Sequence, residues 1–260
     1  MSDESRPEIP DRDRACIRCC SEVDRAIGSV GAHPGNTHKG EKMTQPRQLP
    51  DLADSEIKAL STATDTAVLL IDHQPQMIFG ARSADPQVVI NNVTALAKLA
   101  KLFEIPTVLA SIAATSFAGP LIPEITDVFP ATPVIDRSYI NAWQDGVFRG
   151  AVEATGRRRL VIAGLWTEVC LTFPALSAIE AGYDVFAVVD ASAGSSTAAH
   201  DAAVVRMAQK GVVPVSVANL LSEWQRDWAR EETYGPVNEI IREHMGAWGQ
   251  GVNYVRAMMK

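Results

Sequence analysis

Runs of Val, Ile and Leu alternate with amphipathic stretches along most of this chain. The runs are short and almost uninterrupted, which is typical of strands buried on both faces of a parallel sheet. They predict strands at 66–71, 107–110, 133–136, 160–165, 185–189 and 212–217. In the intervening stretches apolar residues recur with helical spacing. These stretches predict helices at 88–103, 122–129, 145–155, 168–181, 197–210 and 218–230.

The alternation of strand and helix predicts an α/β fold. Strands separated by helices cannot pair as hairpins, so we expect a mostly parallel central sheet covered by helices on both faces. Gly156, Gly182 and Gly211 each follow a predicted helix. Glycine is the residue most often found just beyond a helix end. The predicted boundaries are therefore consistent with the glycine positions.

The two ends of the chain differ from this pattern. Residues 1–52 are rich in Pro, Gly, Ser and charge, with little periodicity, and we expect a disordered extension. Residues 53–235 are predicted to form the folded domain. Residues 236–260 are predicted to be a C-terminal tail, helical at first and in contact with a neighbouring copy in an oligomer.

Charge and composition narrow the class of partner. The net charge of −7 argues against a nucleic-acid-binding protein. No apolar stretch approaches the roughly 20 residues that a membrane span requires. The acidic N-terminus lacks the apolar core of a signal peptide, and a single cysteine in the folded region fits a reducing compartment. We therefore expect a cytoplasmic protein that acts on a small molecule.

A cysteine and histidine pattern in the extension resembles a zinc-site spacing. Cys16 and Cys19 are followed by His33 and His38, which loosely fits zinc ligands. The region 28–36 contains three glycines and a proline, so it is a poor helix and cannot present the histidines as a zinc finger does. We expect no structural zinc.

Cys170 is the most informative residue in the folded region. It lies between the predicted strand 160–165 and a helix whose first turn tolerates Pro174. We expect Cys170 at the N-terminal end of that helix, where free N–H groups and the helix dipole favour a thiolate. The alternative is a structural cysteine that packs as a small hydrophobic residue.

Other polar residues follow the predicted strands. Ligands of open parallel sheets bind beyond the carboxyl ends of the strands. Asp72, Asp136, Arg137, Cys170 and Asp190 all come at such ends. Asp72 is the candidate base for the Cys170 thiol, and Arg137 is a candidate electrostatic clamp because arginine is not deprotonated in proteins. The alternative for Asp72 is a structural role as a turn residue. The alternative for Arg137 is a solvated cation on a loop.

His73 is a second candidate base, but side chains alternate along an extended chain. His73 should then point away from Asp72, so we treat it as structural. His200 lies on a predicted helix and His244 in the tail, and neither has a ligand-like neighbour in the sequence.

Several motifs resemble one family over about residues 65–228. They are 68–74 (VLLIDHQ), 140–143 (INAW), 154–156 (ATG) and 163–178 (AGLWTEVCLTFPALSA). Together they are similar to the isochorismatase-like cysteine hydrolases, most closely the YcaC-like branch. The resemblance implies a Rossmann-like three-layer sandwich around the parallel sheet.

The resemblance also implies a site. It assigns a catalytic triad to Asp72, Arg137 and Cys170, with arginine where most of the superfamily has lysine, as is usual in this branch. It implies a non-proline cis peptide at Leu165–Trp166 and an oxyanion hole made by the backbone N–H groups of Trp166 and Cys170.

Departures from other branches narrow the chemistry. Nicotinamidase members bind a metal through aspartate and histidines, whereas the corresponding region 111–117 contains neither. We therefore expect no metal and no cofactor, and nicotinamide is disfavoured as substrate. Members that cleave isochorismate typically lack the cysteine, so Cys170 points to acyl chemistry.

The leading hypothesis is a metal-free cysteine hydrolase that cleaves a small amide or related C–N substrate through a Cys170 thioester. Candidate pocket residues are Phe117, Asn141, Trp143 and Trp166. One alternative is thiol redox chemistry, suggested by Thr167-x-x-Cys170, although peroxiredoxins have a proline ahead of the threonine. Another is an inactive binding or scaffold member. The branch resembles ring-like oligomers, so we expect a homo-oligomer, with segment 223–228 as a candidate contact.

Overall fold

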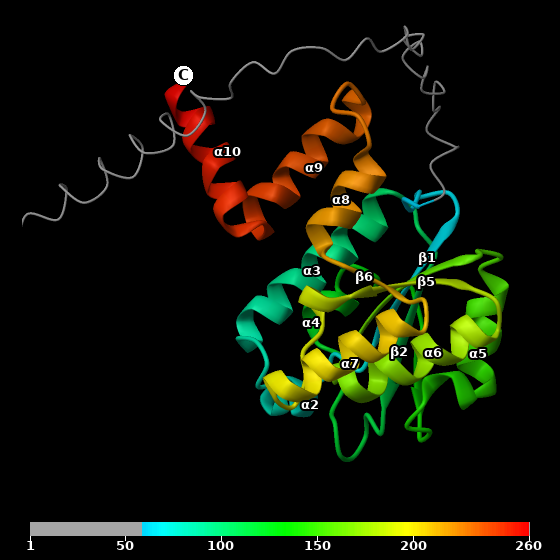
Figure 1. The fold of residues 1–260 in the computed structure, drawn as a ribbon. Coiled ribbons are helices and arrows are strands. Elements are labelled where there is room, and N and C mark those ends of the chain that lie inside the picture. Colours follow the sequence, from blue (N-terminus) through cyan, green and yellow to red (C-terminus); the bar gives the residue numbers. More distant parts are fainter. Residues whose placement is uncertain (1–58, 260) are drawn as a thin grey trace, which may run out of the picture. The chain divides into compact units, whose positions relative to one another are not determined.

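A single parallel sheet organises the computed structural model, which describes residues 59–259 (Figure 1). The predicted extension 1–52 and its zinc-like spacing lie outside the described residues. The strand order is β3-β2-β1-β4-β5-β6, and every pair of neighbours is parallel. The strands are β1 (Thr66–Ile71), β2 (Thr107–Ile112), β3 (Val134–Arg137), β4 (Arg159–Gly164), β5 (Asp184–Val188) and β6 (Val213–Val215).

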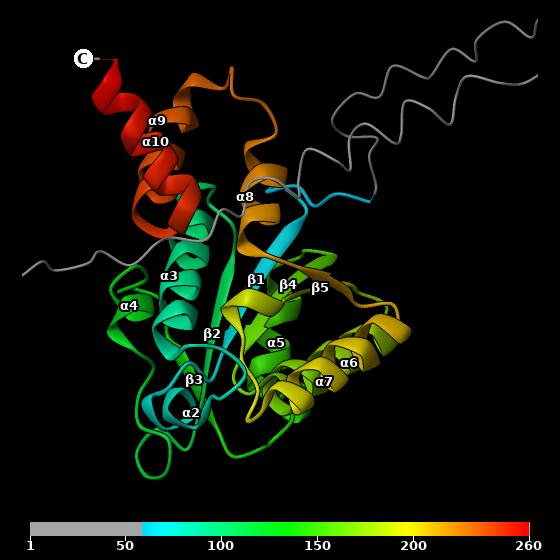
Figure 2. The ribbon, with the colours of Figure 1, turned by 60° about the vertical axis from the view of Figure 1, so that its left-hand side comes forward.

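Helices cover both faces of this sheet, as Figures 1 and 2 show. One face is covered by α3 (Pro86–Leu102), α4 (Pro123–Thr126) and α8 (Val217–Gln225), and α9 (Glu231–His244) packs on α3 and α8. The other is covered by α5 (Gly146–Ala154), α6 (Thr172–Glu180) and α7 (Thr197–Gln209). The predicted α/β fold with a sheet between two helical layers is therefore confirmed.

Strand β1 shows why its sequence is apolar throughout. Val68 and Leu70 contribute to the hydrophobic core under α3 and α8, whereas Ala67, Leu69 and Ile71 contribute to the core under α5 and α6. All five are fully buried. Because neighbouring side chains point to opposite faces, a strand between two helical layers needs apolar residues at every position.

The structure adds short elements that periodicity did not predict. They are α2 (Pro75–Gly80) and the single turns η2 (Ala142–Gln144) and η4 (Val189–Ala191). Each is too short to show a helical period. The predicted helix 218–230 ends at Gln225, since Arg226 has a φ of 60° that no helix accommodates.

The C-terminal tail forms two helices. Helix α9 begins before the predicted boundary at residue 236 and includes Pro236, and it buries Val237, Ile240 and Ile241. Helix α10 (Gly246–Met258) follows it and buries only Gly249. A Cβ on Gly249 would collide with the Ile241 carbonyl oxygen, so glycine permits the close crossing of the two helices.

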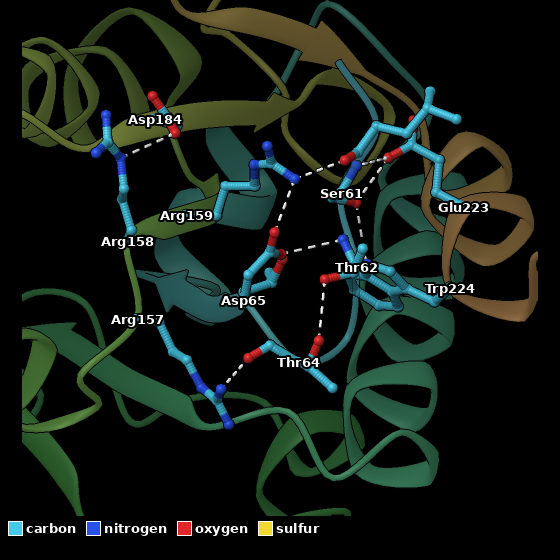
Figure 3. Close-up of polar contacts among 12 residues, drawn as sticks. Ser61, Thr62, Thr64, Asp65, Arg157, Arg158, Arg159, Asp184, Glu223 and Trp224 are labelled. Atoms are coloured by element: carbon cyan, nitrogen blue, oxygen red, sulfur yellow. Dashed lines mark hydrogen bonds and ion pairs between the residues drawn. The ribbon is translucent and has the colours of Figure 1, made fainter. Parts of the chain in front are cut away.

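A polar network joins elements at the amino edge of the sheet (Figure 3). Arg159, at the start of β4, donates to Asp65 at 2.9 Å. Glu223 of α8 accepts from the Ser61 N–H at 2.7 Å and from its hydroxyl at 2.6 Å. The Trp224 indole N–H donates to the same hydroxyl at 3.0 Å. The segment that leads into β1 is thereby attached to β4 and α8.

Candidate active site

Asp72 follows β1 directly and has an unusual backbone conformation. Its φ is 59°, in the left-handed region that L-residues rarely occupy. Its N–H still donates to the Ala110 carbonyl of β2 at 2.9 Å, so the sheet continues up to this residue. Strained backbone of this kind persists only where surrounding contacts impose it, and it is frequent at functional sites.

An ion pair joins Asp72 to Arg137 at the end of β3. Arg137 Nη2 lies 2.6 Å from Asp72 Oδ2, and both side chains are fully buried. Because β2 lies between β1 and β3 in the sheet, the pair spans the end of β2. A second guanidinium nitrogen, Nη1, donates to the Tyr139 carbonyl at 2.5 Å and so orients the arginine.

Cys170 lies on a π-helical turn (η3, Thr167–Leu171) between β4 and α6. The N–H groups of Val169, Cys170 and Leu171 all donate to the Trp166 carbonyl, at 3.0, 2.9 and 3.4 Å. The predicted helix is thus present, and its first residues form a wider π turn. Such turns are common at functional sites. Strands β1 and β4 pair at the centre of the sheet, so this turn begins beside the end of β1.

The side chains of Asp72, Arg137 and Cys170 interact electrostatically. Burial raises the pKa of Asp72, and the Arg137 charge opposes that increase. Burial raises the pKa of the Cys170 thiol well above its ordinary value, and the nearby Asp72 carboxylate raises it further. Asp72 Oδ1 has no donor at full hydrogen-bond geometry among the described residues, although the thiol is close enough for each group to influence the other.

The raised pKa means that the Cys170 side chain is a thiol, not a thiolate, at neutral pH. The expectation that the helix terminus favours a thiolate is wrong for the resting site. The free N–H groups on which it depended instead bind the Trp166 carbonyl, and desolvation opposes the charged form. A buried thiol beside a carboxylate is suited to giving up its proton to that carboxylate as it attacks.

The backbone before Cys170 has the form that the family resemblance implied. The Leu165–Trp166 peptide is cis. The Trp166 backbone N–H is directed at the Cys170 thiol and lowers its pKa, whereas the Cys170 N–H donates to the Trp166 carbonyl at 2.9 Å. Of the two donors proposed for an oxyanion hole, Trp166 is therefore the one directed toward the sulfur.

The candidate pocket residues lie in different surroundings. Phe117 is 62% exposed on the loop after β2. The Trp166 indole N–H donates to the Met77 carbonyl of α2 at 2.7 Å. Asn141 donates to the Ser177 hydroxyl of α6 at 3.0 Å. Trp166, which follows β4, thus contacts α2. Phe117 lies on the loop after β2, whose Ala118 carbonyl accepts from the Gln76 N–H of α2 at 3.4 Å.

Trp143, the fourth candidate, is buried and packs edge-on against Tyr183, with ring centroids 5.5 Å apart. Tyr183 precedes β5, at the amino edge of the sheet. This contact is that of a core residue, and the assignment of Trp143 to a pocket stays a prediction.

Two carboxylates predicted at the strand ends have other partners. Asp136 accepts from the Ser111 hydroxyl and the Ala114 N–H, both at 3.0 Å. Asp190 accepts from the Val217 N–H at 2.9 Å and so caps the start of α8. Their hydrogen bonds hold the loops around Asp72, Arg137 and Cys170, and the Asp136 charge also raises the pKa of Asp72.

The two residues after Asp72 are also fully buried. His73 Nε2 lies 2.9 Å from the Ala191 carbonyl, and burial lowers the pKa of His73 to about 4. The imidazole is therefore neutral and serves as a structural donor, in keeping with the prediction. Gln74 was not singled out from sequence. The available signal was three consecutive polar residues at the end of an apolar strand.

The triad is almost closed to solvent in the single chain. Asp72, Arg137 and Cys170 are exposed by 0%, 4% and 6%. A large cavity of about 770 Å³ lies elsewhere, between α9 and α10. Within residues 59–259, no cluster of three or more His, Cys, Asp or Glu side chains is arranged to bind a metal ion. In the same part of the chain no helix is both long and apolar enough to cross a bilayer.

Comparison with known proteins agrees with this geometry. Residues 66–219 match the family model described as Isochorismatase domain. The chain is 45% identical over 168 residues to Probable hydrolase YcaC of Escherichia coli (strain K12), covering 64% of this chain and 81% of that protein.

Solved structures show the same fold. The E. coli YcaC gene product, described as an octameric hydrolase of unknown specificity, has a TM-score of 0.73 and 39% identity, covering 76% of this chain and 97% of that chain. YcaC from Pseudomonas aeruginosa, determined with hexane-2,5-diol and covalent acrylamide, has a TM-score of 0.73 and 37% identity, covering 78% and 98%. The chain therefore belongs to the isochorismatase family of hydrolases, in its YcaC-like branch.

Proposed function

We propose that this protein is a metal-free cysteine hydrolase that cleaves a small amide or a related C–N bond. The observation that supports this most is the fully buried Asp72–Arg137 pair beside a buried thiol. Arg137 stabilises the carboxylate form of Asp72, which can then accept the Cys170 proton. Burying an ion pair costs desolvation free energy, and buried charged groups with shifted pKa values are frequent at functional sites.

The proposed reaction begins when Cys170 Sγ attacks the substrate carbonyl carbon while its proton moves to Asp72. The carbonyl electron pair moves to oxygen, where the Trp166 N–H stabilises the developing charge. The C–N bond then breaks, and Asp72 returns the proton to the leaving amine. Water then adds to the thioester carbon as its proton moves to Asp72. The C–S bond breaks to release the acid, and Asp72 returns the proton to Sγ, which restores the thiol and the carboxylate.

The raised thiol pKa favours this mechanism over thiol redox chemistry. A peroxide-reducing cysteine reacts as a pre-formed thiolate, which needs a lowered pKa. Cys170 has the opposite shift. Acrylamide, which is bound covalently in the Pseudomonas relative, is a small amide and an electrophile that alkylates nucleophiles such as thiols. A covalent adduct of this electrophile in a relative supports the proposal of nucleophilic chemistry here.

The test is ammonia release from a panel of small primary amides by the purified full-length protein. We expect turnover of at least one amide, and we expect Cys170→Ala to abolish it while the thermal unfolding midpoint stays within a few degrees. Cys170→Ala retaining turnover would rule out the thioester mechanism. Loss of hydrogen peroxide with wild-type protein, without amide turnover, would instead favour the redox alternative.

We also propose that the protein is a homo-oligomer. A relative aligned over 97% of its length is octameric. The C-terminal helices and the segment before them expose large apolar side chains: Trp228, Tyr234, Trp248, Tyr254, Val255, Met258 and Met259. Within the candidate contact segment 223–228, Trp224 is buried in the core, so Trp228 is its exposed tryptophan.

Light scattering measures the mass of the particle in solution and so tests the proposed homo-oligomer. We expect a mass that is a multiple of the 28.0 kDa chain, and a smaller species for Trp248→Glu. Phe79→Glu changes an exposed aromatic residue on α2 and serves as the control. A monomeric wild-type protein would contradict the proposal.

A further inference from the structure

Gln74 is buried directly beside the triad, but its side chain is directed to β2. Its Oε1 accepts from the Ile112 N–H at 3.0 Å, and its Nε2 donates to the Ile112 carbonyl at 3.0 Å. The same Nε2 donates to the Gly119 carbonyl. The N–H of Ile112 requires an acceptor, which sets the orientation of the amide. One side chain thus bonds both backbone polar groups of Ile112.

The register of the sheet explains why Ile112 needs these partners. The Ala110 carbonyl faces β1, since it accepts from the Asp72 N–H. Backbone groups of a strand face the same neighbour at every second residue, so those of Ile112 also face the β1 side. Strand β1 has ended there, because Asp72 turns into the left-handed region. The Gln74 amide replaces the missing backbone of β1.

The same residue is bonded to Asp72. The Gln74 N–H donates to the Asp72 carbonyl at 2.8 Å, which closes a tight turn around His73. Ile112 is in turn the register partner of Arg137 in β3. Gln74 therefore connects the turn that contains the carboxylate to the β2 residue that lies beside the arginine. The Asp72–Arg137 pair spans this connection.

We propose that Gln74 is a positioning residue, which sets the location of the Asp72 carboxylate relative to Arg137 and Cys170. This inference rests on the proposed function for its effect on turnover, but its effect on geometry and thiol reactivity does not depend on the substrate. Without the amide, the turn at Asp72 loses its attachment to β2, and the buried backbone groups of Ile112 lose their partners.

The chain offers a matched control. Gln225, at the end of α8, is also buried, and its Nε2 donates to the Asp227 carbonyl at 2.9 Å. Gln225→Leu removes a buried amide and its bond to backbone far along the chain from the triad. Gln74→Leu removes the amide that bonds both backbone groups of Ile112. Gln74→Asn, one methylene shorter, provides a milder variant in case the leucine variant does not fold.

The first readout is the pH dependence of Cys170 alkylation by iodoacetamide in the full-length protein. Peptide mass spectrometry separates Cys170 from Cys16, Cys19 and Cys20. The Asp72 charge raises the thiol pKa, so displacing Asp72 should move the alkylation midpoint of the Gln74 variants to lower pH. Gln225→Leu should leave the midpoint at the wild-type value. A Gln74 variant that is folded and has the wild-type midpoint overturns the inference.

Two further readouts separate the outcomes. For an amide that the wild type hydrolyses, we expect Gln74→Leu to lower kcat by roughly 10- to 100-fold with little change in KM, since misplacing a catalytic group affects the reacting geometry. A crystal structure of the variant should show Asp72 displaced from Arg137. An ion pair retained at 2.6 Å overturns the inference whether or not the proposed hydrolase activity is found.

Discussion

Strand β1 has an aspartate–arginine pair at each end, and the two pairs differ in almost everything except their chemistry. At the amino edge, Asp65 pairs with Arg159 at 2.9 Å, with the side chains 42% and 12% exposed. At the carboxyl edge, Asp72 pairs with Arg137 at 2.6 Å, with both side chains fully buried. The same two functional groups are thus partly exposed at one end of the strand and fully buried at the other.

The partners of the two pairs differ as well. Asp65 Oδ1 also accepts from the Thr62 N–H and the Thr66 hydroxyl, both at 3.1 Å. Its carboxylate therefore holds the segment that leads into β1. Asp72 Oδ1 and Arg137 Nε are buried without a hydrogen-bond partner among the described residues. Unsatisfied buried polar atoms are costly. The hydrogen bonds of Asp65 at the amino edge stabilise the fold. At the carboxyl edge, where we propose catalysis, Asp72 and Arg137 keep polar atoms that can still form hydrogen bonds.

The largest difference is expected in turnover. Asp72→Asn should lower the turnover of the best amide by about 10²- to 10⁴-fold, the usual contribution of a general base. It should also move the Cys170 alkylation midpoint to lower pH, because the carboxylate charge is lost. Asp65→Asn should keep turnover within about twofold of wild type. Equal losses in steady-state assays of the two variants would contradict the contrast.

The next difference is in stability. Arg137→Met leaves a buried carboxylate without its partner and should lower the free energy of unfolding by about 3–5 kcal/mol. Asp65→Asn breaks the more exposed pair and should cost about 1 kcal/mol or less. Urea denaturation at pH 7 measures both. A loss below about 1 kcal/mol for Arg137→Met would mean that the carboxyl-edge pair is solvated in solution.

A pH effect should come from His73 at the carboxyl edge. Its pKa is lowered to about 4 in the folded protein, so its stability contribution is complete above the unfolded value of 6.5 and is lost as the pH falls toward 4. The lost contribution is about 3 kcal/mol. His73→Asn should flatten this part of a plot of unfolding free energy against pH, and an unchanged slope would show that His73 is not buried as a neutral group.

Asp72 should act in the opposite direction. Its pKa is raised, so its contribution is complete below the unfolded value of 3.8 and is lost as the pH rises through the folded pKa. Protonation of Asp72 stabilises the wild-type fold as the pH falls, and Asp72→Asn removes this contribution. The free energy of unfolding of the variant should therefore fall more steeply on acidification than that of wild type. Urea denaturation between pH 7 and pH 4 tests the sign for both variants.

The smallest effect is expected for an exposed pair at the amino edge. Arg158 and Asp184 are 3.3 Å apart, with side chains 77% and 47% exposed. Asp184→Asn should change the free energy of unfolding by less than about 0.5 kcal/mol, and the difference should shrink at 1 M salt, where charges are screened. A larger, salt-insensitive loss would mean that the amino edge contains a buried pair like that of the carboxyl edge.

Much of the fold followed from local sequence. Each of the predicted strands corresponds to an observed one, because an apolar run between amphipathic stretches is the direct consequence of burial on both faces. The short helix α2 and the division of the tail into α9 and α10 did not follow. Such elements depend on contacts with other parts of the chain, as the Gly249 crossing illustrates.

Sequence by itself determined the strand and helix order, the candidate residues Asp72, Arg137 and Cys170, and the family. These depend on residue type and spacing along the chain. Only the tertiary structure decided that the Cys170 pKa is raised, because burial and the Asp72 charge act through space. It also decided that Gln74 bonds both backbone groups of Ile112, since residues 38 positions apart meet only when β1 ends beside β2.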